Sequence, residues 1–321
     1  MVVAIIYVDN TLFCGPNKAI LDEVKAHFMQ KWKCRDLGEA CEFLHMHICW
    51  NGHKISIDQC TYLNTILQHC RMANAKSMPT LLPARYYLMP NMELLNTVLQ
   101  SRFQQVMRSL LYLSLGTCPD IACAVIALAY QSANPSEDHF NKALYICCYL
   151  IRMWNYSLDY DGHSRLGIMA CTDSNWGSNP TSCHSKTGYF SKIAGRLSSW
   201  SLHVQKSIAL SSTEAEYMVL SDCSHQAIWI WTLLHELGYK EQLISICGNN
   251  QGSIFMASNP ITEKHTKHIN IWYHFVYDVV LDNKVQLYYI KGSENPTDMF
   301  IKNLEHIKFS KFWIELRLHF Y

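Results

Sequence analysis

The chain has 321 residues, enough for about two domains of ordinary size. Hydrophobic residues make up 49% of it and charged residues 17%, a composition that supports a sizeable core and excludes a disordered tail. The formal net charge of +1 is too small to predict nucleic-acid binding from charge alone.

The first 76 residues predict a strand-rich unit with short turns. Asp9 and Asn10 can form a tight turn, Asn17 is a suitable N-cap for a helix, and Asn51-Gly52 is a typical hairpin turn. Residues 77–100 contain three prolines and no clear period, which predicts a linker. The expected elements before the linker are strands at 2–8, 41–50 and 53–57 and helices at 17–33 and 59–71.

Helices are expected next, and an alternating pattern of strands and helices follows them. Pro119 and Pro135 lie where helices begin, as prolines of the first turn do. Ser211 with Glu214, and Thr213 with Glu216, both fit a capping box at the start of a long helix that Gly238 ends. Three strands, a helix, a strand, more helices and another strand indicate an α/β layer fold. The helices before this unit are expected at 101–115, 119–133 and 136–152, and its strands begin at 166.

Fourteen cysteines are scattered through the chain without a C-x-x-C pair. This pattern favours buried free thiols in a reducing compartment over a disulfide-stapled secreted domain. The apolar start, MVVAIIYV, lacks the features of a signal peptide, and no segment reaches the roughly 18 apolar residues that span a bilayer. We therefore expect an intracellular protein, cytoplasmic or nuclear, with no membrane partner.

Several acids occupy positions from which they could share a metal site. Asp173 ends the first strand of the α/β unit, Glu214 and Glu216 lie in the first turn of its long helix, and Asp298 opens the last helix. Two Mg²⁺ ions that hydrolyse a phosphodiester need such carboxylates to neutralise them. Each acid also has an ordinary structural role, in a turn, a cap or the first turn of a helix. Spacing alone leaves both interpretations open.

Segments along the whole chain resemble the Pol polyproteins of copia-type LTR retrotransposons. The helix LSSTEAEYMVLSDCSHQAIWIWTLLHELG (210–238) resembles the hallmark helix of the family's ribonuclease H domain. CTDSNWGSNPTSCHSKTGYF and YYIKGSENPTDMFIKNL are similar to the segments that flank it in the family. IIYVDNTLFCG resembles the reverse transcriptase YVDD hairpin, and RSLLYLSLGTCPDIACAV resembles the connection. The similarity is collinear from residue 2 to about 305.

This resemblance implies a ribonuclease H-like mixed sheet with flanking helices, preceded by a truncated reverse transcriptase palm fragment and a helical connection. The implied divisions are a palm fragment (1–76), a linker (77–100), a helical connection or thumb-like segment (101–160), a ribonuclease H-like domain (161–305) and a C-terminal tail (306–321).

The resemblance also implies roles for the acids. Asp173, Glu216 and Asp298 would bind Mg²⁺ or Mn²⁺ and hydrolyse RNA in an RNA–DNA hybrid, with Glu214 as the fallback for Glu216. The fourth family position is an aspartate, and here it is Asn249. An asparagine keeps one carbonyl oxygen but lacks the charge, so we expect reduced metal affinity and impaired hydrolysis.

The polymerase motif departs further from the family pattern. Asp9 matches the first aspartate of YVDD, and Asn10 replaces the second. Because the sequence begins at this motif, we expect no polymerase active site within residues 1–75. Cys118 stands where the family has an arginine. Two functions stay open: a weakened ribonuclease H, and a catalytically dead protein with a nucleic-acid-binding or structural role. The small net charge weighs against nucleic-acid binding without catalysis.

Overall fold

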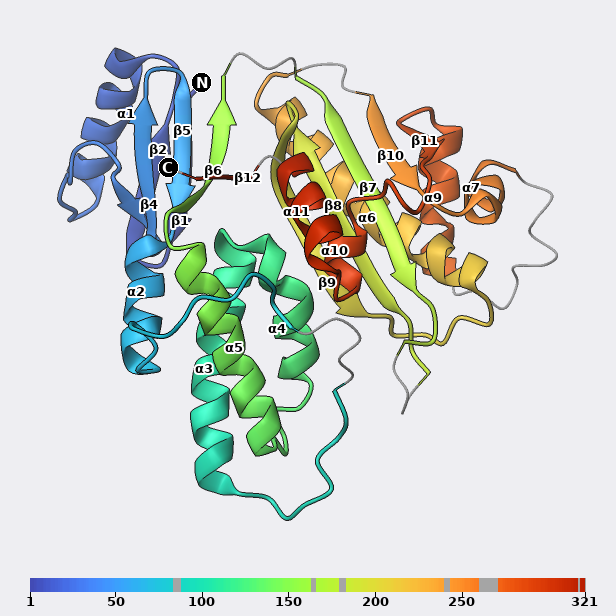
Figure 1. The fold of residues 1–321 in the computed structure, drawn as a ribbon. Coiled ribbons are helices and arrows are strands. Elements are labelled where there is room, and N and C mark those ends of the chain that lie inside the picture. The colour runs from blue at the N-terminus through green and yellow to red at the C-terminus, as the bar shows by residue number, and fades with distance from the viewer. Residues whose placement is uncertain are drawn as a thin grey trace.

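The described strands form two five-stranded sheets and a two-stranded hairpin, in a mixed α/β arrangement around a group of helices (Figure 1). These are the strands of a computed structural model. It describes residues 1–82, 88–162, 166–178, 183–239, 243–259, 271–316 and 318–320.

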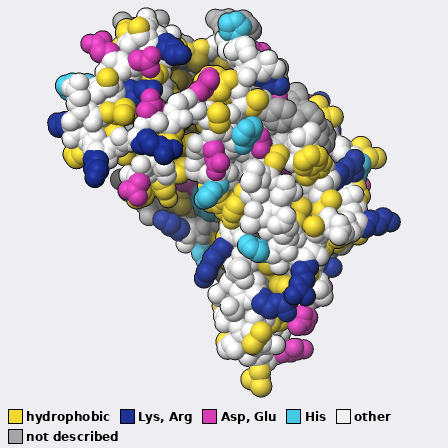
Figure 2. All heavy atoms as spheres, turned by 90° about the vertical axis from the view of Figure 1, so that its left-hand side faces the viewer, with side chains coloured by type: hydrophobic (Ala, Val, Ile, Leu, Met, Phe, Trp, Pro, Cys, Tyr) yellow, Lys and Arg dark blue, Asp and Glu magenta, His cyan; other side chains and the backbone are white. Residues whose placement is uncertain are grey.

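The N-terminal hairpin and its helix have little core of their own. Strands β1 (Val3–Tyr7) and β2 (Asn10–Cys14) pair antiparallel, and helix α1 (Lys18–Lys31) follows. Asn17 caps α1 as expected, because its side chain accepts hydrogen bonds from the first turn. No residue of α1 is buried, and a two-stranded hairpin is only marginally stable alone. Figure 2 faces this side of the molecule and shows hydrophobic side chains at the surface between charges of both signs.

The first five-stranded sheet is antiparallel and joins distant parts of the chain. Its order is β12-β6-β5-β4-β3. The expected hairpin is confirmed, with Gly52 in the turn at a φ of +60°. The ranges are β3 (Glu42–Phe43), β4 (Met46–Asn51), β5 (Lys54–Asp58), β6 (Tyr156–Asp161) and β12 (Leu318–Phe320), and helix α2 (Cys60–His69) follows β5.

Two strands of this sheet come from outside the expected palm fragment. β6 pairs with β5, so that Ile57 lies opposite Leu158, and β12 pairs with β6. The segment expected as a tail also contains helix α11 (His306–Glu315), whose Phe309 and Phe312 are buried. The expectation of a tail at 306–321 is therefore wrong. Pairing between strands so far apart in sequence leaves no local pattern from which it could be read.

Three helical segments lie between helix α2 and strand β6 along the chain. The start of α3 at Thr97 corrects the expected linker by a few residues, because Asn96 accepts a hydrogen bond from Leu99 N and caps the helix. Ser136 caps α5 in a capping box with His139. The helices are α3 (Thr97–Gly116), the 3₁₀ turn η1 (Pro119–Ile121) continuing into α4 (Ala122–Ala129), and α5 (Glu137–Arg152).

The second five-stranded sheet is mixed, in the order β11-β10-β7-β8-β9. β7, β8 and β9 pair antiparallel, whereas β10 runs parallel to both β7 and β11. The ranges are β7 (Ile168–Asn175), β8 (Lys186–Ile193), β9 (Arg196–Val204), β10 (Ile244–Gly248) and β11 (Val285–Tyr289).

Helices cover both faces of this sheet (Figure 1). One face forms a core with the long helix, and the other joins the core of the connecting helices. Ser211 caps the long helix and Gly238 follows it at a φ of +87°, which confirms both expected ends. The helices of the first face are α6 (Ser212–Glu236), α7 (Gln251–Ser258), η3 (Ile271–His274) and α9 (Phe275–Leu281), and α10 (Asp298–Ile301) lies on the second. None of the helices in the described residues is long and apolar enough to cross a membrane.

Candidate functional site

Four of the residues singled out from the sequence meet where two neighbouring strands in the middle of the mixed sheet end. Asp173 lies in β7, and Asn249 directly follows β10, the parallel neighbour of β7. Glu216 projects from α6 and Asp298 is the first residue of α10. The three carboxylate side chains are buried, with exposed fractions of 1% for Asp173, 6% for Glu216 and 4% for Asp298.

Two contacts place α10 and the residues before it beside β7 and β8. The side chain of Asn295, fully buried, donates a hydrogen bond of 2.7 Å to the Thr172 carbonyl. α10 also lies close on β8 at Gly188, where a Cβ atom would come within 2.5 Å of the Ile301 side chain. Only glycine permits this approach, and the approach brings Asp298 next to Asp173. Neither Asn295 nor Gly188 was singled out from the sequence, because their roles depend on contacts between distant elements.

Hydrogen bonds connect the polar groups of the site directly. Asn249 Nδ2 donates to Asp173 Oδ1 over 2.8 Å. The Ser174 backbone N–H donates both to Asp173 Oδ1, at 3.0 Å, and to Glu216 Oε1, at 3.1 Å. The carboxylates of β7 and α6 are thus held by one amide group.

Burial and neighbouring charges shift the acidities of the three acids. Burial, reinforced by the charge of Asp173, raises the pKa of Glu216 to about 8. Burial and a hydrogen bond with Asp298 raise the pKa of Asp173 to about 6, against the opposing charge of Lys302. Burial acts to raise the pKa of Asp298 as well, but hydrogen bonds from Asp173 and nearby lysines outweigh it and hold that pKa below its usual range. The site therefore holds fewer negative charges at neutral pH than three carboxylates suggest.

Two lysines that the sequence analysis did not single out contact the acids. Lys302 Nζ lies 2.5 Å from Asp298 Oδ1 and 3.4 Å from Asp173 Oδ2. Lys308 forms an ion pair with the other oxygen of Asp298. The spacing of Asp298 and Lys302, one helical turn apart, is the only local signal for these contacts.

The remaining candidates lie elsewhere. Glu214 is part of the N-terminal cap of α6, since its Oε2 accepts a hydrogen bond of 2.7 Å from Leu210 N. The structure therefore places Glu216, and not Glu214, beside Asp173. Asp9 and Asn10 are exposed at the turn between β1 and β2, far along the chain from these acids. Across the described part of the chain, no group of three or more His, Cys, Asp or Glu side chains is arranged as a ready metal site.

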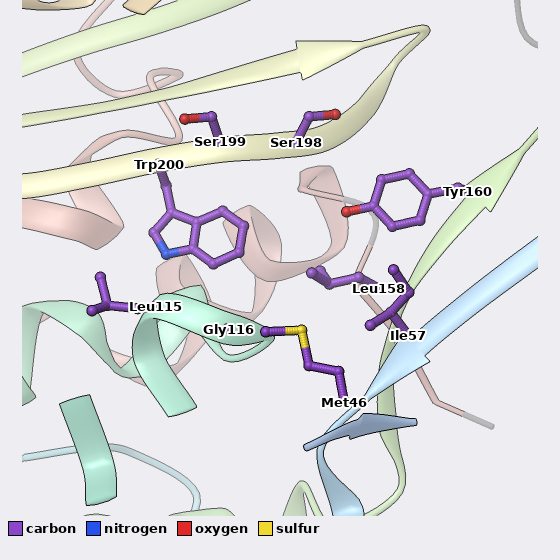
Figure 3. Close-up of a pocket in the computed structure, with 9 residues that line it drawn as sticks. All are labelled: Met46, Ile57, Leu115, Gly116, Leu158, Tyr160, Ser198, Ser199 and Trp200. Carbon is purple, nitrogen blue, oxygen red and sulfur yellow. The ribbon is translucent and has the colours of Figure 1, made fainter. Parts of the chain in front are cut away.

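A separate cavity of about 290 Å³ lies between the antiparallel sheet and β9 (Figure 3). Its polar groups are used within the fold: Trp200 Nε1 donates to the Ser114 carbonyl at 2.8 Å, and Tyr160 Oη donates to the Leu197 carbonyl at 3.0 Å. No acid, histidine or cysteine is among the residues that line it. The lining residues are Met46, Ile57, Leu115, Gly116, Leu158, Tyr160, Ser198, Ser199 and Trp200.

Comparison with known proteins finds relatives along nearly the whole chain. Residues 1–83 match the family of reverse transcriptases (RNA-dependent DNA polymerases). The chain is 29% identical over 317 residues to the retrovirus-related Pol polyprotein from transposon TNT 1-94 of Nicotiana tabacum, which covers 96% of this chain and 24% of the relative. It is 27% identical over 316 residues to the Pol polyprotein from transposon RE1 of Arabidopsis thaliana, covering 97% and 21%. The chain thus spans about a quarter of the length of these relatives or less.

Among solved structures, the chain is similar to a foamy viral protease-reverse transcriptase in complex with an RNA/DNA hybrid. The TM-score is 0.45 and the sequence identity is 14%, with 90% of this chain and 36% of that chain covered. A likeness of this degree is too slight to establish a fold.

Proposed function

Because the chain belongs with the Pol polyproteins of copia-type retrotransposons, we propose that its residues 161–305 are a ribonuclease H-like domain derived from such a polyprotein. Its ancestral reaction is hydrolysis of the RNA strand in an RNA–DNA hybrid, and this copy performs that reaction poorly or not at all. The five-stranded mixed sheet with helices on both faces supports the domain assignment.

The observation that carries this proposal is the convergence of Asp173, Glu216 and Asp298. The three acids come from β7, α6 and α10, and Asp173 and Asp298 are more than 120 positions apart in the chain. They share one buried site with Asn249. Buried carboxylates without a function are costly, because burial penalises their charged form. A cluster of three at the end of a sheet is therefore a candidate for catalysis.

The donor atoms of the site suit a hard divalent cation. Asp173, Glu216 and Asp298 would hold Mg²⁺ or Mn²⁺ through carboxylate oxygens, which such ions prefer. Within the described residues, Asn249 Oδ1 is also buried without a hydrogen-bond partner, so a carbonyl oxygen is free to add to the set. A bound ion would supply the positive charge that acidifies an attacking water and stabilises the phosphoryl transition state.

The residues of this chain weaken that site in two ways. Asn249 brings no charge, and its amide donates to an oxygen of Asp173 that a cation would need. Lys302 forms ion pairs with both Asp173 and Asp298, so a cation that binds to these carboxylates has to displace the ammonium group of Lys302. Both effects lower the affinity of the site for the ion. Cleavage of an RNA–DNA hybrid, the ancestral substrate class, is therefore slower than in the ancestral enzyme.

The polymerase portion is proposed to be inactive. Asp9 is exposed in the turn before β2 and Asn10 is the exposed first residue of that strand, so the position of the second family aspartate carries no charge. We propose that residues 1–76, with β6 and β12 completing the sheet, serve as a scaffold for the connecting helices.

A hybrid-cleavage assay in Mg²⁺ and in Mn²⁺ tests the proposal. It compares the natural chain with Asn249→Asp, which restores the missing carboxylate. Asn250→Asp is the matched control, because it adds the same charge one residue away, where an aspartate can still cap α7. We expect cleavage of the RNA strand to rise at least tenfold in Asn249→Asp and to stay unchanged in the control. Equal cleavage by the natural chain and Asn249→Asp would overturn the claim that Asn249 impairs the site.

A second candidate is a catalytically dead structural or nucleic-acid-binding protein. The ion pairs of Lys302 and Lys308 with Asp298 favour it, since they satisfy the carboxylate without a metal. Absence of cleavage by the natural chain and by Asn249→Asp alike would replace the nuclease proposal with this one. Gel shifts with an RNA–DNA hybrid at two salt concentrations would then separate nucleic-acid binding from a structural role.

A further inference from the structure

Two cysteines face each other across neighbouring strands of the mixed sheet. Cys171 lies in β7 and Cys247 in β10, and the register of this parallel pair places them directly side by side. Their chain neighbours Ala170 and Ile246 point into the core under α6. Cys171 and Cys247 belong to the core on the opposite face, so both thiols project from the same side of the sheet.

The register also brings the two thiols close together, because they extend on the same face from directly paired residues of neighbouring strands. Paired strands lie about 4.8 Å apart, and disulfides span Cα separations of about 4.4 to 6.8 Å. The Cα atoms of the two cysteines therefore lie within the range that a disulfide spans.

Reagents can reach this pair from one side. Cys171 is buried, with 3% of its surface exposed, whereas Cys247 is only partly buried. Cys247 is therefore the thiol that meets an oxidant first, and Cys171 is the one placed to react with the product. An accessible cysteine beside a second thiol is the arrangement of redox-sensitive pairs.

We propose that Cys171 and Cys247 form an oxidation site that closes to a disulfide between β7 and β10 when the chain meets a peroxide. This inference does not depend on the proposed nuclease activity. In the first step the Cys247 sulfur takes one oxygen from hydrogen peroxide, becomes a sulfenic acid and releases water. The Cys171 sulfur then attacks the Cys247 sulfur, the S–O bond breaks, and the leaving hydroxide takes the Cys171 proton as a second water. The sum is two thiols and one peroxide to one disulfide and two waters.

The position of the bond gives it a consequence for the fold. Two residues beyond each cysteine stand Asp173 and Asn249, which already share a hydrogen bond. A disulfide closes the long chain segment that contains β8, β9 and α6 into a loop, and it restricts the unfolded chain more than the folded one. Oxidation should therefore raise the thermal stability of the sheet.

Peptide mapping of the full chain after peroxide treatment and alkylation tests the inference. We expect one linked peptide pair that joins Cys171 to Cys247, and a rise in Tm of about 5 °C or more that dithiothreitol reverses. Cys247→Ser should abolish both effects. Cys123→Ser is the matched control, because it removes a buried thiol from the same core and should leave both effects in place.

Three results would overturn the inference. One is a fully reduced pair under conditions that oxidise the exposed Cys34 to a sulfenic acid. Another is a linked pair of Cys70 and Cys147, which also lie in this core, with no linkage at Cys171. The third is an unchanged Tm rise in Cys247→Ser. If Cys247→Ser does not fold, the same mapping is done on Cys171→Ala. The inference then predicts that Cys247 appears in no disulfide-linked peptide of this variant, and any linked peptide that contains Cys247 contradicts it.

Discussion

The buried carboxylate of Asp120 should make the stability of the chain depend on pH in a specific way. Asp120 is 2% exposed in the turn η1, and Tyr149 Oη donates to its Oδ2 over 2.5 Å. No lysine or arginine pairs with it among the described residues, and Cys118, at the position of the family's arginine, is a buried neighbour. Burial raises the pKa of Asp120 to about 6 from its ordinary 3.8.

The magnitude follows from this difference. A pKa of about 6 in the folded chain against 3.8 in the unfolded one corresponds to about 3 kcal/mol. Because the folded state holds the proton more tightly, the contribution to stability is complete below pH 3.8 and is lost as the pH rises through 6. In the Asp120→Asn variant the side chain at this position cannot ionise. The variant therefore does not lose this stability as the pH rises. The difference in unfolding free energy, variant minus natural chain, should increase by about 2 to 3 kcal/mol between pH 4 and pH 7.5.

Urea unfolding at both pH values measures this change. The packing cost of the new amide does not depend on pH, so it cancels in the difference between the two measurements. Other acids titrate equally in the two proteins and cancel as well. Asp138→Asn serves as the control, because its side chain is 58% exposed on α5 and should give no such change. A difference between Asp120→Asn and the natural chain that is the same at both pH values would refute the reasoning.

Three further variants test the fold and the site. Phe312→Ala should lower the free energy of unfolding by about 3 to 5 kcal/mol in urea melts, because Phe312 is fully buried; a loss below 1 kcal/mol would mean that α11 is a detachable tail after all. Ser136→Ala should cost about 1 kcal/mol by removing the cap of α5, and Ser136→Asp should recover it in the same melts. Lys302→Gln should increase Mn²⁺ binding at least tenfold by calorimetry, whereas Lys311→Gln, on the next helix and paired with Glu315, should not; equal binding by both contradicts the role of Lys302.

Local patterns predicted the elements that local interactions determine. The cap at Ser211 and the glycine at 238 located both ends of α6, because these residues stabilise helix ends without help from distant contacts. Asn51-Gly52 located the hairpin to within one residue: Asn51 ends β4, and the turn is at 52–53. The strands β6 and β12 were missed for the opposite reason. Nothing in YSLDYD indicates that its partner lies a hundred residues earlier.

Part of the candidate site could likewise be predicted from the sequence, and part of it could not. Asp173, Glu216 and Asp298 were found by resemblance to a family, and chain order alone could not have chosen Glu216 over Glu214. The folded structure distinguishes the two glutamates. Glu216 is buried beside Asp173, whereas Glu214 accepts a hydrogen bond at the N-terminus of α6. The ion pairs of the two lysines with Asp298 could not be predicted, because Lys308 reaches it from a different helix.

The amide of Asn249 changes the balance of charge beside Asp173. With an aspartate there, its carboxylate would face that of Asp173 at hydrogen-bond distance, and two such charges repel unless a cation or a proton lies between them. The amide of Asn249 removes the repulsion and donates a proton instead. Asp298 is paired with Lys302 and Lys308. The substitution that we propose weakens catalysis would thus also relieve this repulsion.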